Sequence, residues 1–268
     1  MAQVAVEICD SATKLEERHR DAVVVCGSHG GVYPAYLAAK AGLRAVILCD
    51  AGVGMDRAGI GCLYYCQALG MAAATIDTTT ARIADGEDLH RRGRISHANV
   101  VAEAAGVEAG QSVAEAALRL REARVWSGEP PPYREARTVI RDEPGKPRVI
   151  VMDSVSLVRP EDAGQIVLTG SHGALLAGRP DSAISTPVLA AAFNDAGVGI
   201  DRAGISRLPA LDAQGIAGVT VDTMSARIGD GRSTFEDGVL SHVNATAAAR
   251  GARPGMSARA FVDLLLAG

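Results

Sequence analysis

Residues 22–31, Ala-Val-Val-Val-Cys-Gly-Ser-His-Gly-Gly, decide the fold of this 268-residue chain. The first five residues are an uninterrupted apolar run, which is typical of a strand buried on both faces of a parallel sheet. Glycine and polar residues end the run, and the Ala-rich segment 33–41 that follows predicts a helix. A strand, a turn and a helix in this order indicate a βα unit.

The same pattern occurs a second time in the chain. Residues 27–30, Gly-Ser-His-Gly, recur at 170–173, which is 143 residues later, and residues 50–54, Asp-Ala-Gly-Val-Gly, recur at 195–199. Shorter matches follow in the same order in both copies, namely Asp-Arg-Ala-Gly-Ile, Asp-Thr, Ala-Arg-Ile, Asp-Gly and Ser-His-x-Asn. We therefore predict an internal duplication of a unit of about 120 residues, which is a usual domain size.

The repeat also predicts the domain organisation. The first α/β repeat is expected in residues 1–121 and the second in residues 146–268, related by a pseudo-two-fold. Five prolines lie between positions 130 and 147, so the segment 122–145 is expected to be a stiff, exposed linker.

Each copy contains four short apolar runs that predict strands. In the first copy they are 4–8, 22–26, 45–49 and 72–76, and in the second they are 149–152, 166–169, 188–193 and 217–221. The Ala-rich run 188–193 is also compatible with a helix. Helix-compatible segments separate the runs, so the predicted fold class is α/β with mainly parallel sheets.

Polar motifs begin where most of these predicted strands end. Because ligands bind outside the carboxyl ends of strands in open parallel sheets, we expect the site at this rim. The alternative is that these residues are only turn formers and helix caps. The candidate catalytic residues are Ser28, His29 and Asp50 in the first copy and Ser171, His172 and Asp195 in the second.

His29 is the most distinctive of these candidates. Gly27 and Gly31 flank it at the spacing of a nucleophile elbow, with histidine at the apex, whereas Ala174 replaces the last glycine in the second copy. A histidine raised toward a ligand in this way can act as a general acid or base. The alternative is a histidine that hydrogen-bonds a neighbouring loop.

A second group of paired residues is expected to bind the substrate. Arg82 and Arg227 suit a carboxylate or phosphate of the substrate, although ion pairs with Asp85 and Asp230 are an equal alternative. His97 and His242 are expected to open helices. The candidate binding residues are Asp77, Thr78, Arg82, Asn99, Asp222, Thr223, Arg227 and Asn244.

Composition excludes several classes of partner. With 27 basic and 31 acidic residues the net charge is −4, and no Lys/Arg-rich run suggests a nucleic-acid groove or an anionic membrane surface. We also expect no targeting segment and no membrane span. The five cysteines all lie in the first quarter, which argues against a disulfide framework and favours a reducing cytoplasm.

No cofactor is expected, because neither a G-x-G-x-x-G nor a Walker A sequence occurs. Asp10, Asp50 and Asp77 could offer oxygen ligands to Mg²⁺, which is a secondary alternative. Cys49 is an alternative nucleophile of the first copy, against the plainer interpretation of a buried thiol.

These residues favour a cytoplasmic small-molecule enzyme. A cofactor-independent hydrolase or lyase, acting on a small carboxylate or amide, suits a histidine, neighbouring Ser and Asp residues and an arginine clamp. The alternatives are a non-catalytic ligand-binding or sensory protein and a subunit of a larger assembly, including a homo-oligomer. Tyrosines 33, 36, 64 and 65 and all cysteines lie in the first copy, so we expect one surviving or composite site.

Overall fold

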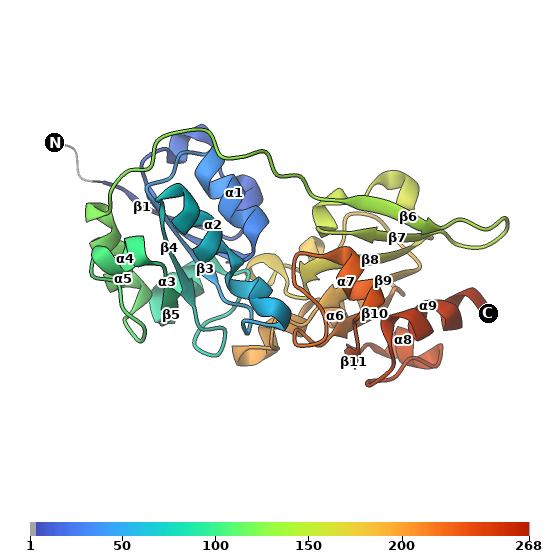
Figure 1. The fold of residues 1–268 in the computed structure, drawn as a ribbon. Coiled ribbons are helices and arrows are strands. Elements are labelled where there is room, and N and C mark those ends of the chain that lie inside the picture. Colours follow the sequence, from blue (N-terminus) through green and yellow to red (C-terminus); the bar gives the residue numbers. More distant parts are fainter. Residues whose placement is uncertain (1–3, 268) are drawn as a thin grey trace. The chain divides into compact units, whose positions relative to one another are not determined.

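The structure is a computed structural model that describes residues 4–267. The chain is mixed α/β, with two mostly parallel sheets interleaved with helices, which confirms the predicted fold class (Figure 1). Its residues divide into two compact units. Unit 1 comprises Met1–Val53, Arg57–Arg134 and Gly199–Asp201, and unit 2 comprises Gly54–Asp56, Glu135–Val198 and Arg202–Gly268.

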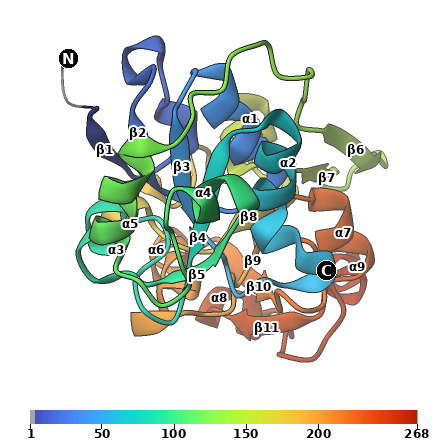
Figure 2. The ribbon, with the colours of Figure 1, turned by 60° about the vertical axis from the view of Figure 1, so that its left-hand side comes forward.

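Unit 1 contains a five-stranded sheet in the order β1-β2-β3-β4-β5. The first four strands are parallel, and β5 runs antiparallel to β4. Figure 2 shows β1 beside β2 at one edge of this sheet. The strands are β1 Val6–Cys9, β2 Val23–His29, β3 Ala45–Cys49, β4 Ala72–Ile76 and β5 Ile95–Ala98.

Helices cover both faces of the unit 1 sheet. The apolar sides of α1 (Val32–Lys40) and α2 (Gly61–Leu69) pack on Val24, Val46 and neighbouring residues. The alternate residues of β2 and β3 point to the other face, where α3 (Gly86–Arg92) and α5 (Val113–Arg119) contact each other and β2. Shorter elements are η1 Ala12–Lys14, η2 Glu17–His19, η3 Met55–Ile60, α4 Val100–Ala104 and η4 Leu120–Glu122.

Unit 2 contains a six-stranded sheet in the order β11-β10-β9-β8-β7-β6. Its strands β7 to β10 are parallel, and β6 and β11 run antiparallel to their neighbours. The run 188–193, which was also compatible with a helix, lies mostly in strand β9. The strands are β6 Arg137–Arg141, β7 Val149–Met152, β8 Ile166–His172, β9 Ala190–Asn194, β10 Ala217–Val221 and β11 Leu240–Val243.

The helices of unit 2 differ most from those of unit 1 in the segment between β8 and β9. No α-helix corresponds to α1, because Gly178, Pro180 and Pro187 interrupt the segment between β8 and β9, which forms two single 3₁₀ turns instead. The helical elements are η5 Val155–Leu157, η6 Pro160–Asp162, η7 Leu176–Gly178, η8 Pro180–Ser182, η9 Ile200–Ile205, α6 Arg207–Asp212, α7 Gly231–Glu236, α8 Ala245–Ala249 and α9 Ala258–Ala267.

The expected linker 122–145 is only partly a linker. Residues 125–136 hold no helix or strand, and Tyr133 there packs its ring 6.0 Å from that of Tyr33 on α1. The following residues form β6, which pairs with β7. The second half of the segment is therefore part of the unit 2 sheet, because its Arg-Thr-Val-Ile-Arg sequence supplies a β-branched edge strand.

The strand order corrects one premise of the site prediction. A crevice forms at the carboxyl ends of parallel strands where the strand order reverses. Within each sheet the parallel strands follow chain order, so no such reversal occurs among the described residues. Strand ends alone therefore do not define a binding crevice, and each candidate residue has to be judged by its own contacts.

Candidate functional site

His29 lies at the end of β2 and not at the apex of a tight turn. Strand β2 continues through Ser28 and His29, and residues 27–31 all keep negative φ. The elbow comparison is therefore wrong in geometry. The glycines serve close packing instead, because a Cβ at Gly31 would lie 2.6 Å from the His29 ring and one at Gly30 would collide with the Gly59 carbonyl.

The hydrogen bonds of His29 fix its neutral tautomer. Its Nδ1 accepts a hydrogen bond from the Gly31 backbone N–H at 3.1 Å, so the proton of the neutral ring is on Nε2. Burial lowers the pKa of His29 to about 4, although the residue as a whole is only half-buried. At neutral pH His29 is therefore an uncharged hydrogen-bond donor, and not the general acid or base that the sequence suggested.

We expect the His29 ring to titrate near pH 4, with Nε2–H as the neutral tautomer. Below pH 6.5 the unfolded chain binds a proton that the folded chain does not, so this residue lowers stability as the pH falls from about 6.5 to about 4. Nitrogen-15 NMR of the imidazole measures both the pKa and the tautomer. A pKa near 6.5, or a Nδ1–H tautomer, would contradict this assignment.

His172 occupies the corresponding place at the end of β8 in unit 2. Its Nδ1 accepts from the Ala174 backbone N–H at 3.3 Å, and only 8% of the residue is exposed. His29 has the same arrangement, but the residue is only half-buried and Gly31 stands at the position of Ala174. Of the two histidines, His29 is therefore the better placed to meet a ligand.

The two candidate serines hold backbone close to these histidines. The Ser28 hydroxyl oxygen accepts a hydrogen bond from the Ala12 N–H at 2.9 Å, and that of Ser171 accepts from the Val155 N–H at the same distance. Both residues are buried. These contacts attach the first 3₁₀ turn of each unit to the neighbouring strand, which makes the serines positioning residues.

Asp50 and Asp195 are buried carboxylates with the same pattern of partners. Asp50 Oδ1 accepts from the backbone N–H groups of Gly52 at 3.0 Å and Thr78 at 3.1 Å, and Asp195 accepts from Gly197 and Thr223 likewise. Burial raises the pKa of both carboxyls, and these hydrogen bonds act against that rise. Each carboxylate thus ties two strand ends together and is not a free catalytic base.

A strained turn follows Asp50. Residues 51–54 have φ values of 50°, 74°, 64° and 70°, and residues 196–199 in unit 2 repeat this left-handed run. Left-handed backbone costs roughly 1–2 kcal/mol for each non-glycine residue, and Val53 is β-branched. Such strain persists where surrounding contacts enforce it, frequently at functional sites. Here the Val53 N–H donates to the Asp50 carbonyl, and the Val53 carbonyl accepts from Gly59.

Asp77 and Asp222 are turn formers, as the alternative interpretation held. Asp77 Oδ1 accepts from the Thr79 N–H and hydroxyl at 2.8 and 2.7 Å, and Asp222 accepts from the Met224 N–H at 2.8 Å. The next residues, Thr78 and Thr223, are buried, and their N–H groups donate to Asp50 and Asp195. These four residues therefore shape the turns after β4 and β10 and have structural roles.

Arg82 and Arg227 both lie within ion pairs. Arg82 pairs with Asp85 at 2.9 Å and with Asp88 at 3.3 Å. Arg227 lies 4.0 Å from Asp230. The ion-pair alternative therefore describes these residues, and their guanidinium groups are not free anion clamps.

The side chains of Asn99 and Asn244 hydrogen-bond only to backbone groups. Asn99 Oδ1 accepts from Ala73 and Ala102, and its Nδ2 donates to the carbonyls of Met71 and Leu63. Asn244 makes the same four contacts in unit 2. Because these bonds use the amide's acceptor and both donors, neither side chain is left to bind a substrate.

The histidines before these asparagines lie in strands and not at helix starts. His97 is in β5 and His242 in β11, and each helix begins only after its asparagine cap. The Nδ1 atoms of both rings are buried without a hydrogen-bond partner. His97 lines a cavity of about 510 Å³ with Ser96, Glu103 and Glu108.

Neither the Cys49 thiol nor the acidic side chains of the described residues form a reactive or metal-binding site. Cys49 is fully buried, and burial raises its pKa to about 12, so the thiol is not the alternative nucleophile considered above. All five cysteines are free. Among residues 4–267, no three His, Cys, Asp or Glu side chains are grouped as a metal site would require.

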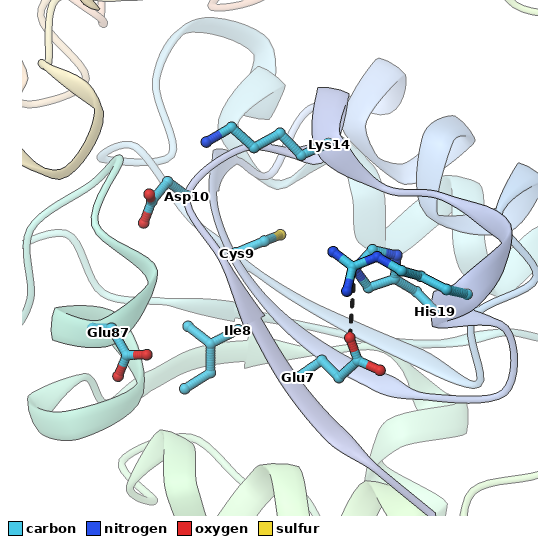
Figure 3. A pocket seen from close by; sticks show the side chains of 8 residues that line it. Glu7, Ile8, Cys9, Asp10, Lys14, His19 and Glu87 are labelled. Atoms are coloured by element: carbon cyan, nitrogen blue, oxygen red, sulfur yellow. Dashed lines mark ion pairs between the residues drawn. The ribbon is translucent and has the colours of Figure 1, made fainter.

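Beside β1 the structure has a polar cavity of about 430 Å³ that sequence reasoning missed (Figure 3). Its labelled side chains come from β1, the first 3₁₀ turns and α3. His19, which resembles a surface residue in the sequence, is only 3% exposed and lies 3.5 Å from a Glu7 carboxylate oxygen. The lining residues are Glu7, Ile8, Cys9, Asp10, Lys14, Arg18, His19 and Glu87.

Cys9 is the thiol of this cavity. A hydrogen bond with Cys26 lowers its pKa from the ordinary value, and the charge of Lys14 acts in the same direction. Asp10 was the only signal for this region in the sequence, since Asp-Ser follows the first strand in both copies. The other lining residues do not recur in the second copy, so the repeat could not identify them.

No helix among the described residues has the length and apolar character needed to cross a membrane. Comparison with known proteins found no matching family model, no matching curated protein and no matching solved structure.

Proposed function

We propose that the chain is a small-molecule enzyme, a cofactor-independent hydrolase or lyase for a small carboxylate- or amide-containing substrate, with its reacting site at the end of β2 in unit 1. One observation carries this proposal. His29 is held as a neutral imidazole with its proton on Nε2, at a strand end and in a residue that is only half-buried.

A fixed neutral donor suits reactions in which negative charge develops on a carbonyl oxygen. Removing one such donor typically costs 10²–10³ in rate, because the donor is oriented before the reaction begins. In this proposal His29 is the catalytic residue, while Ser28 and Asp50 are positioning residues that hold the neighbouring backbone. The strained turn after Asp50 recurs after Asp195, so strain is consistent with a site at this end of either sheet and does not distinguish the two units.

Unit 1 is favoured over unit 2 because His172 is more buried than His29. The proposal includes a cytoplasmic location, which the five free thiols support, and a homo-oligomer that binds neither nucleic acid nor membrane.

The test compares H29A with H172A on a panel of chromogenic esters and anilides. Proton NMR follows small hydroxy- and amino-carboxylates for elimination in parallel. We expect H29A to lower kcat about 100-fold with the folded state retained, and H172A to leave turnover nearly unchanged. G31A should cause a smaller loss, because its Cβ displaces the His29 ring.

Two results would overturn the proposal. Unchanged turnover in H29A would remove this histidine from the mechanism. Binding of a panel compound by the wild-type chain without any turnover would instead establish the non-catalytic alternative.

A further inference from the structure

The outer edge of β1 is open in unit 1, whereas the matching edge in unit 2 is covered. β7 pairs with the antiparallel strand β6, and all four β7 residues are buried. β1 occupies the corresponding edge, 143 residues earlier, and within residues 4–267 its only strand partner is β2. All four of its residues keep partial exposure, and the 430 Å³ cavity lies beside it.

The backbone of β1 is free to accept another strand. The Val23 N–H of β2 donates to the Ala5 carbonyl at 3.0 Å, so Ala5 faces β2. Successive residues of a strand alternate in direction, so Glu7 and Cys9 also face β2, while Val6 and Ile8 direct their N–H and C=O groups outward. Such an edge is a template for an added strand.

Asp10 and Asp153 have one hydrogen bond to backbone in common, and Asp153 makes two further bonds to the residue that precedes the edge strand β6. Asp153 Oδ1 accepts from the Gly231 N–H, and Asp10 Oδ1 accepts from Gly86 in the same way. Asp153 Oδ2 also accepts from the Ala136 N–H at 2.7 Å, and its own N–H donates to the Ala136 carbonyl. These two bonds hold the start of β6. Asp10 places the same pair of groups at the open edge of β1.

The charges beside the edge differ between the units in a way that specifies the partner. Arg137 of β6 lies opposite Met152 and pairs with Asp162 at 2.6 Å. In unit 1 the residues at the positions of Leu157, Glu161 and Asp162 are Lys14, Arg18 and His19. Arg18 and His19 thus replace two acidic residues, and Lys14 adds a further positive charge. Glu7 lies close to His19, and Glu16 pairs with Arg18 at 3.1 Å. On the other face of β1, Glu87 lies beside Ile8 (Figure 3).

We propose that the outer edge of β1 binds an extended peptide segment of another protein as an antiparallel strand. Asp10 forms two hydrogen bonds with the backbone of a small residue of this segment, one through its carboxylate and one through its own N–H, as Asp153 does with Ala136. The next residue is acidic and faces Lys14 and Arg18, and the one after it is basic and faces Glu87. None of the residues that line the cavity beside β1 is among those placed at the His29 site.

The probe is a blocked, fluorescein-labelled peptide of residues 133–141 of this chain that carries R137E and T138K. The register of β6 on β7 places its Ala136 opposite Asp10 and its position 138 opposite Ile8. Fluorescence anisotropy with the full chain should show one-to-one binding. The unmodified 133–141 peptide should bind about tenfold more weakly, because Arg137 would face Lys14 and Arg18. A peptide with proline at position 138 should lose binding, since it lacks the N–H that pairs with Ile8.

Two variants of the chain test the edge itself. D10N keeps the acceptor for Gly86 but replaces the second carboxylate oxygen by an N–H₂ group, and I8P removes an N–H that the β1–β2 pairing does not use. Both should weaken the probe about tenfold. The matched variant D153N should leave probe binding unchanged, because it alters only unit 2.

A hydrogen-exchange measurement on the wild-type chain covers the case in which a variant fails to fold. The Val6 and Ile8 amides should become protected when the probe is added. Equal binding of the probe and the proline peptide, or no protection at β1, would overturn the proposal. So would a concentration-dependent dimer that I8P dissociates, because the occupant would then be a second copy of the chain.

Discussion

Asn99→Ala is expected to destabilise unit 1 by about 3–5 kcal/mol, which is among the largest effects of any single change proposed here. The buried amide caps α4 and also ties the Ala73 N–H and the Met71 and Leu63 carbonyls together. Loss of a cap costs about 1 kcal/mol, and each buried group left without a partner adds about 1–3 kcal/mol. Urea unfolding followed by the fluorescence of Trp126, which packs on the unit 1 core, measures this change.

Three matched variants sharpen this expectation. Asn244→Ala should cost unit 2 a similar free energy, because Asn244 has the same four backbone contacts. Ser112→Ala, which removes only a helix cap, should cost about 1 kcal/mol. Asn99→Asp keeps the acceptor oxygen but replaces the donor amino group by a second oxygen that faces the Leu63 and Met71 carbonyls. Because a protonated carboxyl can donate there and a carboxylate cannot, this variant should be less harmful at pH 4 than at pH 7. If Asn99→Ala lowered the free energy of unfolding no more than Ser112→Ala does, the hydrogen bonds of Asn99 to backbone would not stabilise unit 1 as proposed.

Arg207→Met is expected to destabilise unit 2 by about 3 kcal/mol. The fully buried guanidinium donates to the carbonyls of Ala174, Ser182 and Ala183 and lies 4.6 Å from the centre of the Phe193 ring. Burial lowers the pKa of Arg207 to about 10, so removing the charge relieves a desolvation cost. The three orphaned carbonyls and the lost ring contact outweigh that relief.

The stability lost in Arg207→Met should be independent of pH between 5 and 9, because the Arg207 guanidinium stays protonated below its lowered pKa. Chemical denaturation at several pH values, with hydrogen exchange of β9 and α6, measures it. Arg253→Met, at an exposed position, is the control and should change stability by less than about 0.5 kcal/mol. Unchanged stability of the Arg207 variant would show that the loop of η7 and η8 does not depend on this residue.

Local pattern predicted most of the strands in the sheets. The apolar runs 22–26, 45–49, 72–76 and 217–221 are central strands, because central parallel strands are buried on both faces and their sequence shows it directly. Strands β5, β6 and β11 were missed. They lie at sheet edges and mix polar with apolar residues, so an apolar run does not mark them.

The candidate site was predicted less well than the fold. Pattern and spacing found the paired polar residues, yet Asp77, Arg82, Asn99 and their counterparts proved to be held by backbone or by ion pairs. A turn former, a cap and a ligand all favour the same residue types after a strand, so the sequence could not separate them. The contacts of each side chain in the structure separate these three roles.

The sequence by itself determined the α/β class, the positions of the central strands along the chain and the repeated motifs, because periodicity and glycine placement act locally along the chain. Only the tertiary structure decided the chemical state of each group. His29 is a neutral donor because surrounding protein buries it and because the Gly31 N–H occupies Nδ1. Within residues 4–267 the outer edge of β1 has no strand partner while that of β7 is covered, because the segment β6 pairs with β7 alone. Burial, hydrogen-bond partners and edge coverage depend on residues distant in sequence, which a local pattern does not record.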